Sequence, residues 1–172
     1  MDIALRELID KQAIAEIHAR YCRALDRMDK AMAYDLFRDD CRVNYHGIYA
    51  GTGHGFVDWV WQAHAHMERH SHQITSMLIE TNGDSAVSEA YVTVVLWTLA
   101  DEDGMQKEIV CRGRYLDRFE REGGMWRITQ REHVVDMHSV YALDRAAISE
   151  CSTRDHSDAS WRFFGDNTGK VQ

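Results

Sequence analysis

The chain has 172 residues, a length that fits one domain with a single sizeable core. Its formal net charge of -8 argues against nucleic acid or an anionic membrane surface as a partner. It contains no proline-rich or glycine-rich linker and no run of about 20 apolar residues that would span a membrane.

The N-terminal stretch MDIALRELID is charged from its second residue, which is not typical of a secretory signal. We therefore expect a cytoplasmic protein. The cysteines lie far apart and lack the spacing of a metal site, so free thiols are expected in a reducing cytosol. They are Cys22, Cys41, Cys111 and Cys151.

The first part of the chain has helical character. Apolar residues recur at helical spacing from Ile3 to about Met28, which predicts a long helix. A short helix is expected from Lys30 to Phe37, and the stretch CRVNYHGIYAGTG after it indicates a strand, a turn and a short strand. Helical spacing returns in GFVDWVWQAHAHMERH, residues 55–70.

Strand-like runs dominate after this point. They are SHQITSMLIET, SAVSEAYVTVVLWTLA, MQKEIVCRGRYLDRFERE and MWRITQREHVVDMHSVY, separated by turn residues in NGD, DEDG and EGG. Helices first and a meander of strands afterwards predict an α+β domain. The strands are long enough to curl around the first helix, so we expect a strongly curved, mainly antiparallel sheet beginning near Ser71.

We expect the domain to cover residues 1–144 and a polar extension to cover residues 145–172. The extension contains SWRFFGD, whose aromatic residues favour packing onto the domain or onto a neighbouring subunit; a solvated tail is the alternative. The run VTVVLW is too continuous for a strand that buries only one face, which favours a homo-oligomer.

A carboxylate stands near the end of the first predicted helix, in YCRALD. The small residues in line with Asp26 on the same helix face are Cys22, Ala19 and Ala15. Such residues leave space beside the helix, and Tyr21 can point its hydroxyl toward the same space. The alternative is a carboxylate that faces solvent.

The stretch HAHMERHSH contains several histidines. His66 and His70 are four residues apart on the expected helix, a spacing that can bind zinc, but the acidic residue of a metalloprotease motif is missing and solvated histidines are the simpler interpretation. His72 opens a strand and is either a satisfied core residue or a general base. The residues expected on its strand face are Ile74, Ser76 and Leu78.

Polar candidates also occur in other predicted strands. The stretch MWRITQREHVVD carries Arg131 and His133. Arg131 can reach inward to an anion or an oxyanion, and an exposed arginine at the sheet edge is the alternative. Tyr45 and Tyr49, on either side of the HG turn, offer further hydroxyls, although aromatic residues at these positions need no function.

Together these features resemble the SnoaL-like branch of the nuclear-transport-factor-like superfamily, whose fold is a cone-shaped α+β barrel. RYCRALD is similar to a helix end of bile-acid dehydratase, and NYHGIYAG to a strand pair of hexachlorocyclohexane dehydrochlorinase. SHQITSMLIE is similar to the strand that carries the family's catalytic histidine, and WRITQR to a strand with an active-site arginine. Scytalone dehydratase is a further similar member.

The resemblance implies a cofactor-independent lyase or isomerase, of dehydratase type, that acts on a hydrophobic ring-containing molecule of polyketide, steroid or aromatic metabolism. Tyr21 stands where the dehydrochlorinase has a lysine, so dehydrochlorination is not implied. Together with the residue patterns described above, the resemblance predicts two sets of site residues. The catalytic residues are Asp26, His72 and Tyr21, and the substrate-binding residues are Tyr45, Tyr49, Arg131 and His133.

Residue chemistry is compatible with this reaction. Elimination of water from a carbonyl-activated substrate needs a base with a pKa near neutrality, which histidine has, and a group that stabilises the enolate. An aspartate bonded to the other ring nitrogen fixes the tautomer, so we expect Asp26 and His72 within hydrogen-bond reach or bridged by one water. No metal or organic cofactor is expected.

Two other functions remain open. The superfamily includes non-catalytic assembly modules, such as the small subunits of ring-hydroxylating dioxygenases, and a simple ligand carrier is a weaker alternative. A small hydrophobic molecule, and neither nucleic acid nor membrane, is the expected partner. The similar enzymes are trimers, so a homotrimer is expected before a dimer.

Overall fold

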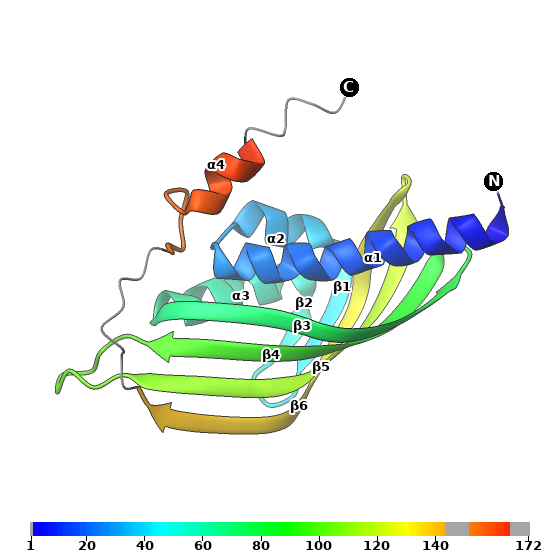
Figure 1. The fold of residues 1–172 in the computed structure, drawn as a ribbon. Helices are drawn as coiled ribbons and strands as arrows, with labels where there is room; N and C mark the ends of the chain where they lie inside the picture. Colours follow the sequence, from blue (N-terminus) through cyan, green and yellow to red (C-terminus); the bar gives the residue numbers. More distant parts are fainter. Residues whose placement is uncertain (1, 144–151, 166–172) are drawn as a thin grey trace.

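A long helix lies across the concave side of a curled sheet in the computed structural model, which describes residues 2–143 and 152–165 (Figure 1). The helices are α1 (Ile3–Asp26), α2 (Lys30–Leu36), α3 (Gly53–Ala65) and α4 (Ala159–Gly165). The strands are β1 (Phe37–Tyr45), β2 (Tyr49–Thr52), β3 (Met67–Asn82), β4 (Ser85–Thr98), β5 (Lys107–Glu122) and β6 (Met125–Ala142). The predicted α+β class is confirmed.

The sheet has six strands in the order β2-β1-β6-β5-β4-β3, and it curls without closing. All neighbouring pairs are antiparallel except β1 and β6, which run parallel. The prediction of a curved, mainly antiparallel sheet is confirmed, but the prediction that it begins near Ser71 is wrong. The early strands β1 and β2 belong to the same sheet, because β1 adds to the free side of β6, and β3 starts at Met67.

Helix α1 buries large apolar side chains only from its middle onward. Asp2 caps its N-terminus by accepting the Ala4 backbone N–H at 2.9 Å. The core begins at Ile14, whereas the large apolar side chains of the first turns are exposed. The apolar spacing predicted the helix correctly, although it did not show where the sheet ceases to cover it. The exposed residues are Ile3, Leu5, Leu8 and Ile9.

Strand β3 does not keep one face inward along its whole length. His70 and His72 are buried, and the pairing with β4 then shifts register between Ile74 and Met77. Beyond the shift the opposite set of residues faces inward, so Ile79 packs on the core. Leu78 is exposed, and the prediction that it shares the inward face of His72 is wrong.

None of the described helices is both long enough and apolar enough to cross a membrane. Cys22, Cys41 and Cys111 are free thiols, and Cys151 lies outside the described residues, as does the predicted boundary at residue 144.

Candidate active site

Helix α1 ends beside the edge strand β3, and its last residue is Asp26. Met28 adopts the left-handed conformation, with φ of 53°, and its backbone N–H donates to the Leu25 carbonyl at 3.2 Å. The Asp29 N–H donates to the Ala24 carbonyl at 2.8 Å, which completes a Schellman motif. These bonds stop the helix abruptly and fix the position of the Asp26 carboxylate.

Asp26 holds His72 by two contacts. Its Oδ1 lies 2.7 Å from His72 Nδ1, and its Oδ2 accepts the His72 backbone N–H at 3.0 Å. A carboxylate can only accept, so the Nδ1 atom carries the proton, and in the neutral imidazole Nε2 then has the lone pair. The expected distance between the two residues is confirmed, and a solvent-facing Asp26 is excluded because only 14% of its side chain is exposed.

The stripe of small residues in line with Asp26 on α1, formed by Ala15, Ala19 and Cys22, was expected to border an interior space, and it does not. Ala15 and Cys22 are partly buried, but Ala19 is exposed. The stripe therefore borders solvent at the side of the helix, and Asp26 reaches the interior because the neighbouring strand β3 passes beside the helix end.

Two tyrosine hydroxyls meet in the interior next to the dyad. Tyr21 and Tyr45 are buried, and their hydroxyl oxygens lie 2.9 Å apart. The Tyr21 ring stands edge-on to the ring of His72, with centroids 6.5 Å apart. Burial raises the pKa of both tyrosines, so both stay protonated near neutral pH. One of the two hydroxyl protons forms the shared bond, and the other remains able to donate to a bound molecule.

Arg131 is fully buried, so the alternative of an exposed sheet-edge arginine is wrong. Its Nε and Nη2 donate to both carboxylate oxygens of Asp117 at 2.8 and 2.7 Å. The guanidinium carbon lies over both the Tyr21 and the Tyr115 ring, at 4.2 and 4.3 Å from their centroids. Its Nη1 has no hydrogen-bond partner among the described residues, which leaves the N–H groups of this nitrogen unused beside the two tyrosines.

His133 also carries unused hydrogen-bonding capacity. Its ring centroid lies 4.7 Å from that of Tyr45 and 5.4 Å from that of Tyr115, and neither of its buried nitrogens has a partner among the described residues. Such groups mark a place for a polar ligand atom or a water. The structure does not bring Tyr49 to the dyad, because its hydroxyl donates to the Thr52 carbonyl at 3.1 Å.

Two further histidines were missed by the sequence interpretation. His64 and His70 are buried, and their ring centroids lie 4.4 Å apart and 5.8 and 6.5 Å from that of His72. The prediction of solvated histidines is wrong for His64 and His70, whereas His66 is exposed as predicted. The histidines do not share one helix either, because α3 ends at Ala65, His66 forms its C-cap, and His70 belongs to β3. The described residues contain no group of histidine, cysteine or carboxylate side chains that could hold a metal ion.

Asp117 was also missed, although the sequence contains a signal for it. In RYLDRF the buried Tyr115 and Phe119 alternate with exposed or half-buried residues, and Asp117 stands between them on the inward face. A carboxylate on an apolar strand face needs a buried partner, and a cation is the strongest one available.

Burial keeps several histidines neutral. It lowers the pKa of His18 and His133 to about 4, that of His64 to about 3 and that of His70 to about 2. In the unfolded chain each would titrate near its ordinary value of 6.5. As the pH falls below this value, the unfolded state binds protons that the folded state does not.

Folding stability is therefore expected to fall as the pH drops from about 7 to about 5, by up to about 1.4 kcal/mol per pH unit for each buried histidine. Stability falls with falling pH because the pKa values of these histidines are lower in the folded state than in the unfolded state. The pH range from about 7 to about 5 lies above the range in which the carboxylates titrate. Urea denaturation across this range measures the slope. The variant His18→Gln should lower the slope by about one proton, and a stability that does not change with pH would contradict the expectation.

The sequence matches the family model of the SnoaL-like domain over residues 6–132, which is most of the chain. The chain belongs to the SnoaL-like family. The family predicted from the sequence is thus confirmed. A comparison of this SnoaL-like chain with curated protein sequences finds no match.

Solved structures share the fold of this SnoaL-like chain. A type 2 hexachlorocyclohexane dehydrochlorinase is 15% identical, with 83% of this chain and 95% of that chain covered and a TM-score of 0.70. A scytalone dehydratase-like protein from Novosphingobium aromaticivorans is 20% identical, with 83% and 97% covered and a TM-score of 0.69. A protein assigned as the β subunit of an aromatic-ring-hydroxylating dioxygenase from the same organism is 23% identical, with 82% and 95% covered and a TM-score of 0.60.

Proposed function

We propose that the protein is a cofactor-independent lyase of dehydratase type, acting on a hydrophobic, ring-containing molecule with a hydroxyl group β to a carbonyl. The observation that carries the proposal is the double contact of Asp26 with the side chain and backbone of His72. It leaves the Nε2 lone pair of a positioned imidazole available as a general base.

The proposed reaction begins when His72 Nε2 removes a proton from the carbon next to the carbonyl. The C–H electron pair forms an enolate, and Asp26 stabilises the imidazolium. The enolate then re-forms the carbonyl as the bond to the β-hydroxyl breaks, and the proton on His72 passes to that hydroxyl, which leaves as water. The spare proton of the Tyr21–Tyr45 pair supplies a hydrogen bond to the enolate oxygen.

The surroundings suit a ring-containing substrate. Tyr45 stacks on Phe56 with ring centroids 4.4 Å apart, and Tyr115 and Phe37 pack edge-on against Tyr21. These rings give the dyad an apolar surrounding, which suits a substrate with an apolar ring, while a few polar groups set its orientation. Return of the proton to a different carbon, rather than loss of hydroxide, would make the same base an isomerase.

The proposal is tested with β-hydroxy ketones, for which loss of water creates a conjugated enone with strong ultraviolet absorbance. One probe is the aldol adduct of benzaldehyde and acetone, and a second is a steroid with a hydroxyl β to a ketone. We expect enzyme-dependent enone formation that is unaffected by chelators. If a panel of aromatic and steroidal β-hydroxy ketones gives no enone with folded protein, the dehydratase proposal is wrong.

A second candidate function is an assembly module, which is favoured by the similar fold of the dioxygenase β subunit. Such a module depends on a large subunit for its stability. Expression of the chain alone distinguishes the two, because a stable assembly without a partner is expected of the lyase.

We also propose a homo-oligomer, with a trimer expected before a dimer. The outer face of β3 and β4 exposes Leu78, Val87 and Tyr91, which suit burial against a second copy. We expect light scattering to give the mass of an oligomer at micromolar concentration and Tyr91→Asp to lower it. The control is Met125→Asp, an exposed apolar residue at the β5–β6 turn, and a monomeric wild-type protein would contradict the expectation.

A further inference from the structure

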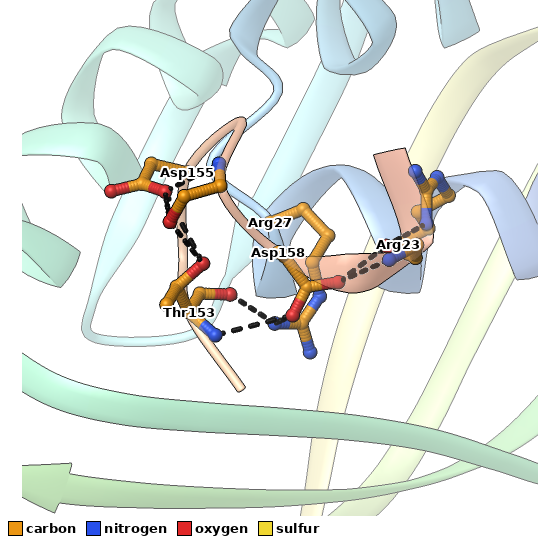
Figure 2. Close-up of polar contacts among 7 residues, drawn as sticks. Arg23, Arg27, Thr153, Asp155 and Asp158 are labelled. Carbon is orange, nitrogen blue, oxygen red and sulfur yellow. Dashed lines mark hydrogen bonds and ion pairs between the residues drawn. The ribbon is translucent and has the colours of Figure 1, made fainter. Parts of the chain in front are cut away.

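The described part of the C-terminal segment, residues 152–165, is bound to the last turns of α1 (Figure 2). Arg27 Nη1 donates to the Thr153 carbonyl and forms an ion pair with Asp158 at 3.2 Å. Arg23 Nη1 donates to Ser160 Oγ at 3.0 Å. The segment is therefore attached to the same end of α1 that carries the dyad carboxylate.

The turn that begins the segment is itself ordered by hydrogen bonds. Asp155 Oδ1 accepts the Ser157 backbone N–H at 2.8 Å and the Thr153 hydroxyl at 3.2 Å (Figure 2). Asp158 Oδ2 accepts the Thr153 backbone N–H at 3.1 Å. Because both of its chain neighbours are held in this way, Arg154 has a defined starting position.

Arg154 extends from this turn to the buried histidines. Its Nη1 donates to the His64 carbonyl at 2.9 Å and lies 2.5 Å from His70 Nε2. A guanidinium has donors and no acceptor, so His70 Nε2 must accept this bond with its lone pair. The remaining ring nitrogen of His70, Nδ1, then carries the proton.

The Nδ1 atom of His70 is buried and has no partner among the described residues. An unpaired buried donor costs free energy unless a ligand or a water satisfies it. The ring of His70 lies 6.5 Å from that of His72 by centroids. His70 also lines a pocket of about 360 Å³ at the edge of the sheet, together with Arg27, Ser71, Val95, Trp97 and Ser152, and His72 is not among the residues that line it.

The charge state of His70 suits a hydrogen-bond donor. Burial, reinforced by the neighbouring His64 and Arg154, lowers the pKa of His70 to about 2. The ring therefore stays neutral in the pH range where the protein is folded. A neutral imidazole N–H can polarise a carbonyl without adding a charge next to the base.

We propose that Arg154 is a positioning residue that fixes the Nδ1–H tautomer of His70, and that His70 donates this hydrogen bond to an oxygen of the substrate beside His72. The role toward substrate rests on the proposed function, whereas the tautomer does not. In this arrangement the C-terminal segment supplies part of the site.

Nitrogen NMR of isotope-labelled histidine tests the tautomer directly. We expect a His70 ring with protonated Nδ1 and unprotonated Nε2 in the wild-type protein and in Arg154→Lys, which keeps a donor. The apolar variant Arg154→Met should populate the Nε2–H form, and the control Arg162→Met in the same segment should not. A wild-type His70 protonated on Nε2, or a tautomer unchanged in Arg154→Met, would overturn the proposal.

The substrate role is tested with benzalacetone, the enone formed from the aldol probe. We expect its addition to shift the His70 Nδ1 resonance in the wild-type protein, and the absence of any shift would overturn the role of His70. In turnover of the probe, Arg154→Met should lower kcat on the order of 10-fold, with KM little changed and Arg154→Lys restoring the rate.

These measurements separate the two proposals. A wild-type protein that does not dehydrate the probe would count against the proposed function, while the tautomer and the benzalacetone shift would still decide the role of Arg154 and His70. A changed tautomer with unchanged kcat in Arg154→Met would overturn the contribution of His70 to turnover.

Discussion

His72→Ala is expected to abolish turnover of the aldol probe, because the proposed general base is lost. The fold should stay intact, because the backbone N–H of residue 72 can still donate to Asp26. Asp26→Asn is expected to lower kcat by about 10²-fold or more. The asparagine side chain can still accept the His72 backbone N–H through its oxygen. Its NH₂ group would then face Nδ1 and favour the tautomer with the proton on Nε2, which blocks the base.

The matched control is Asp35→Asn, which removes an exposed carboxylate from α2 and should leave kcat unchanged. Circular dichroism and a urea midpoint for each variant distinguish lost chemistry from lost structure. Wild-type kcat in a folded Asp26→Asn variant would show that the carboxylate does not orient the base, and the proposed mechanism would be wrong.

Asp117→Leu is expected to cost about 3–5 kcal/mol of unfolding free energy. The reason is that Arg131, none of whose surface is exposed, would keep its charge without a carboxylate in the interior. The double variant Asp117→Leu with Arg131→Met removes both charges and should recover most of this loss, since an apolar pair of similar volume needs no compensation. Urea denaturation at neutral pH measures both.

The control for this pair is Glu16→Gln, which breaks an exposed ion pair with Arg20 on α1. It should cost less than about 1 kcal/mol, because solvent screens exposed charges. If Asp117→Leu lost no more unfolding free energy than this control, the buried Asp117–Arg131 pair would not stabilise the fold as proposed.

Local pattern was sufficient to predict α1 and the hairpin strands, whereas the Asp26–His72 contact was predicted only with the family resemblance added. Asp26 ends an amphipathic helix and His72 opens an alternating strand, so each side chain could be oriented from its own element. The resemblance to the SnoaL-like family then placed the two side chains together. The turn residues also predicted the strand connections correctly, since Gly83 of the predicted NGD turn adopts the left-handed conformation, with φ of 63°.

Other features depend on partners that local pattern does not show. The stretch from His66 to His70 fits a helix as well as a strand, and only its pairing with β4 decides. The register shift of β3 after Ile74 likewise arises between strands. Arg154 lies 84 residues from His70 in the chain and stands in no periodic pattern, so nothing near it in sequence indicates its partner.

The contact between Asp26 Oδ2 and the His72 backbone has a consequence for self-association. Strand β3 is the outermost strand on its side of the sheet, so no strand of this sheet pairs with its outward backbone groups. The His72 amide is one of these, and the carboxylate occupies it. A side chain that lacks an acceptor at position 26 would therefore uncover a template for strand addition. Selection against aggregation would then maintain the carboxylate even in a relative that has lost its chemistry.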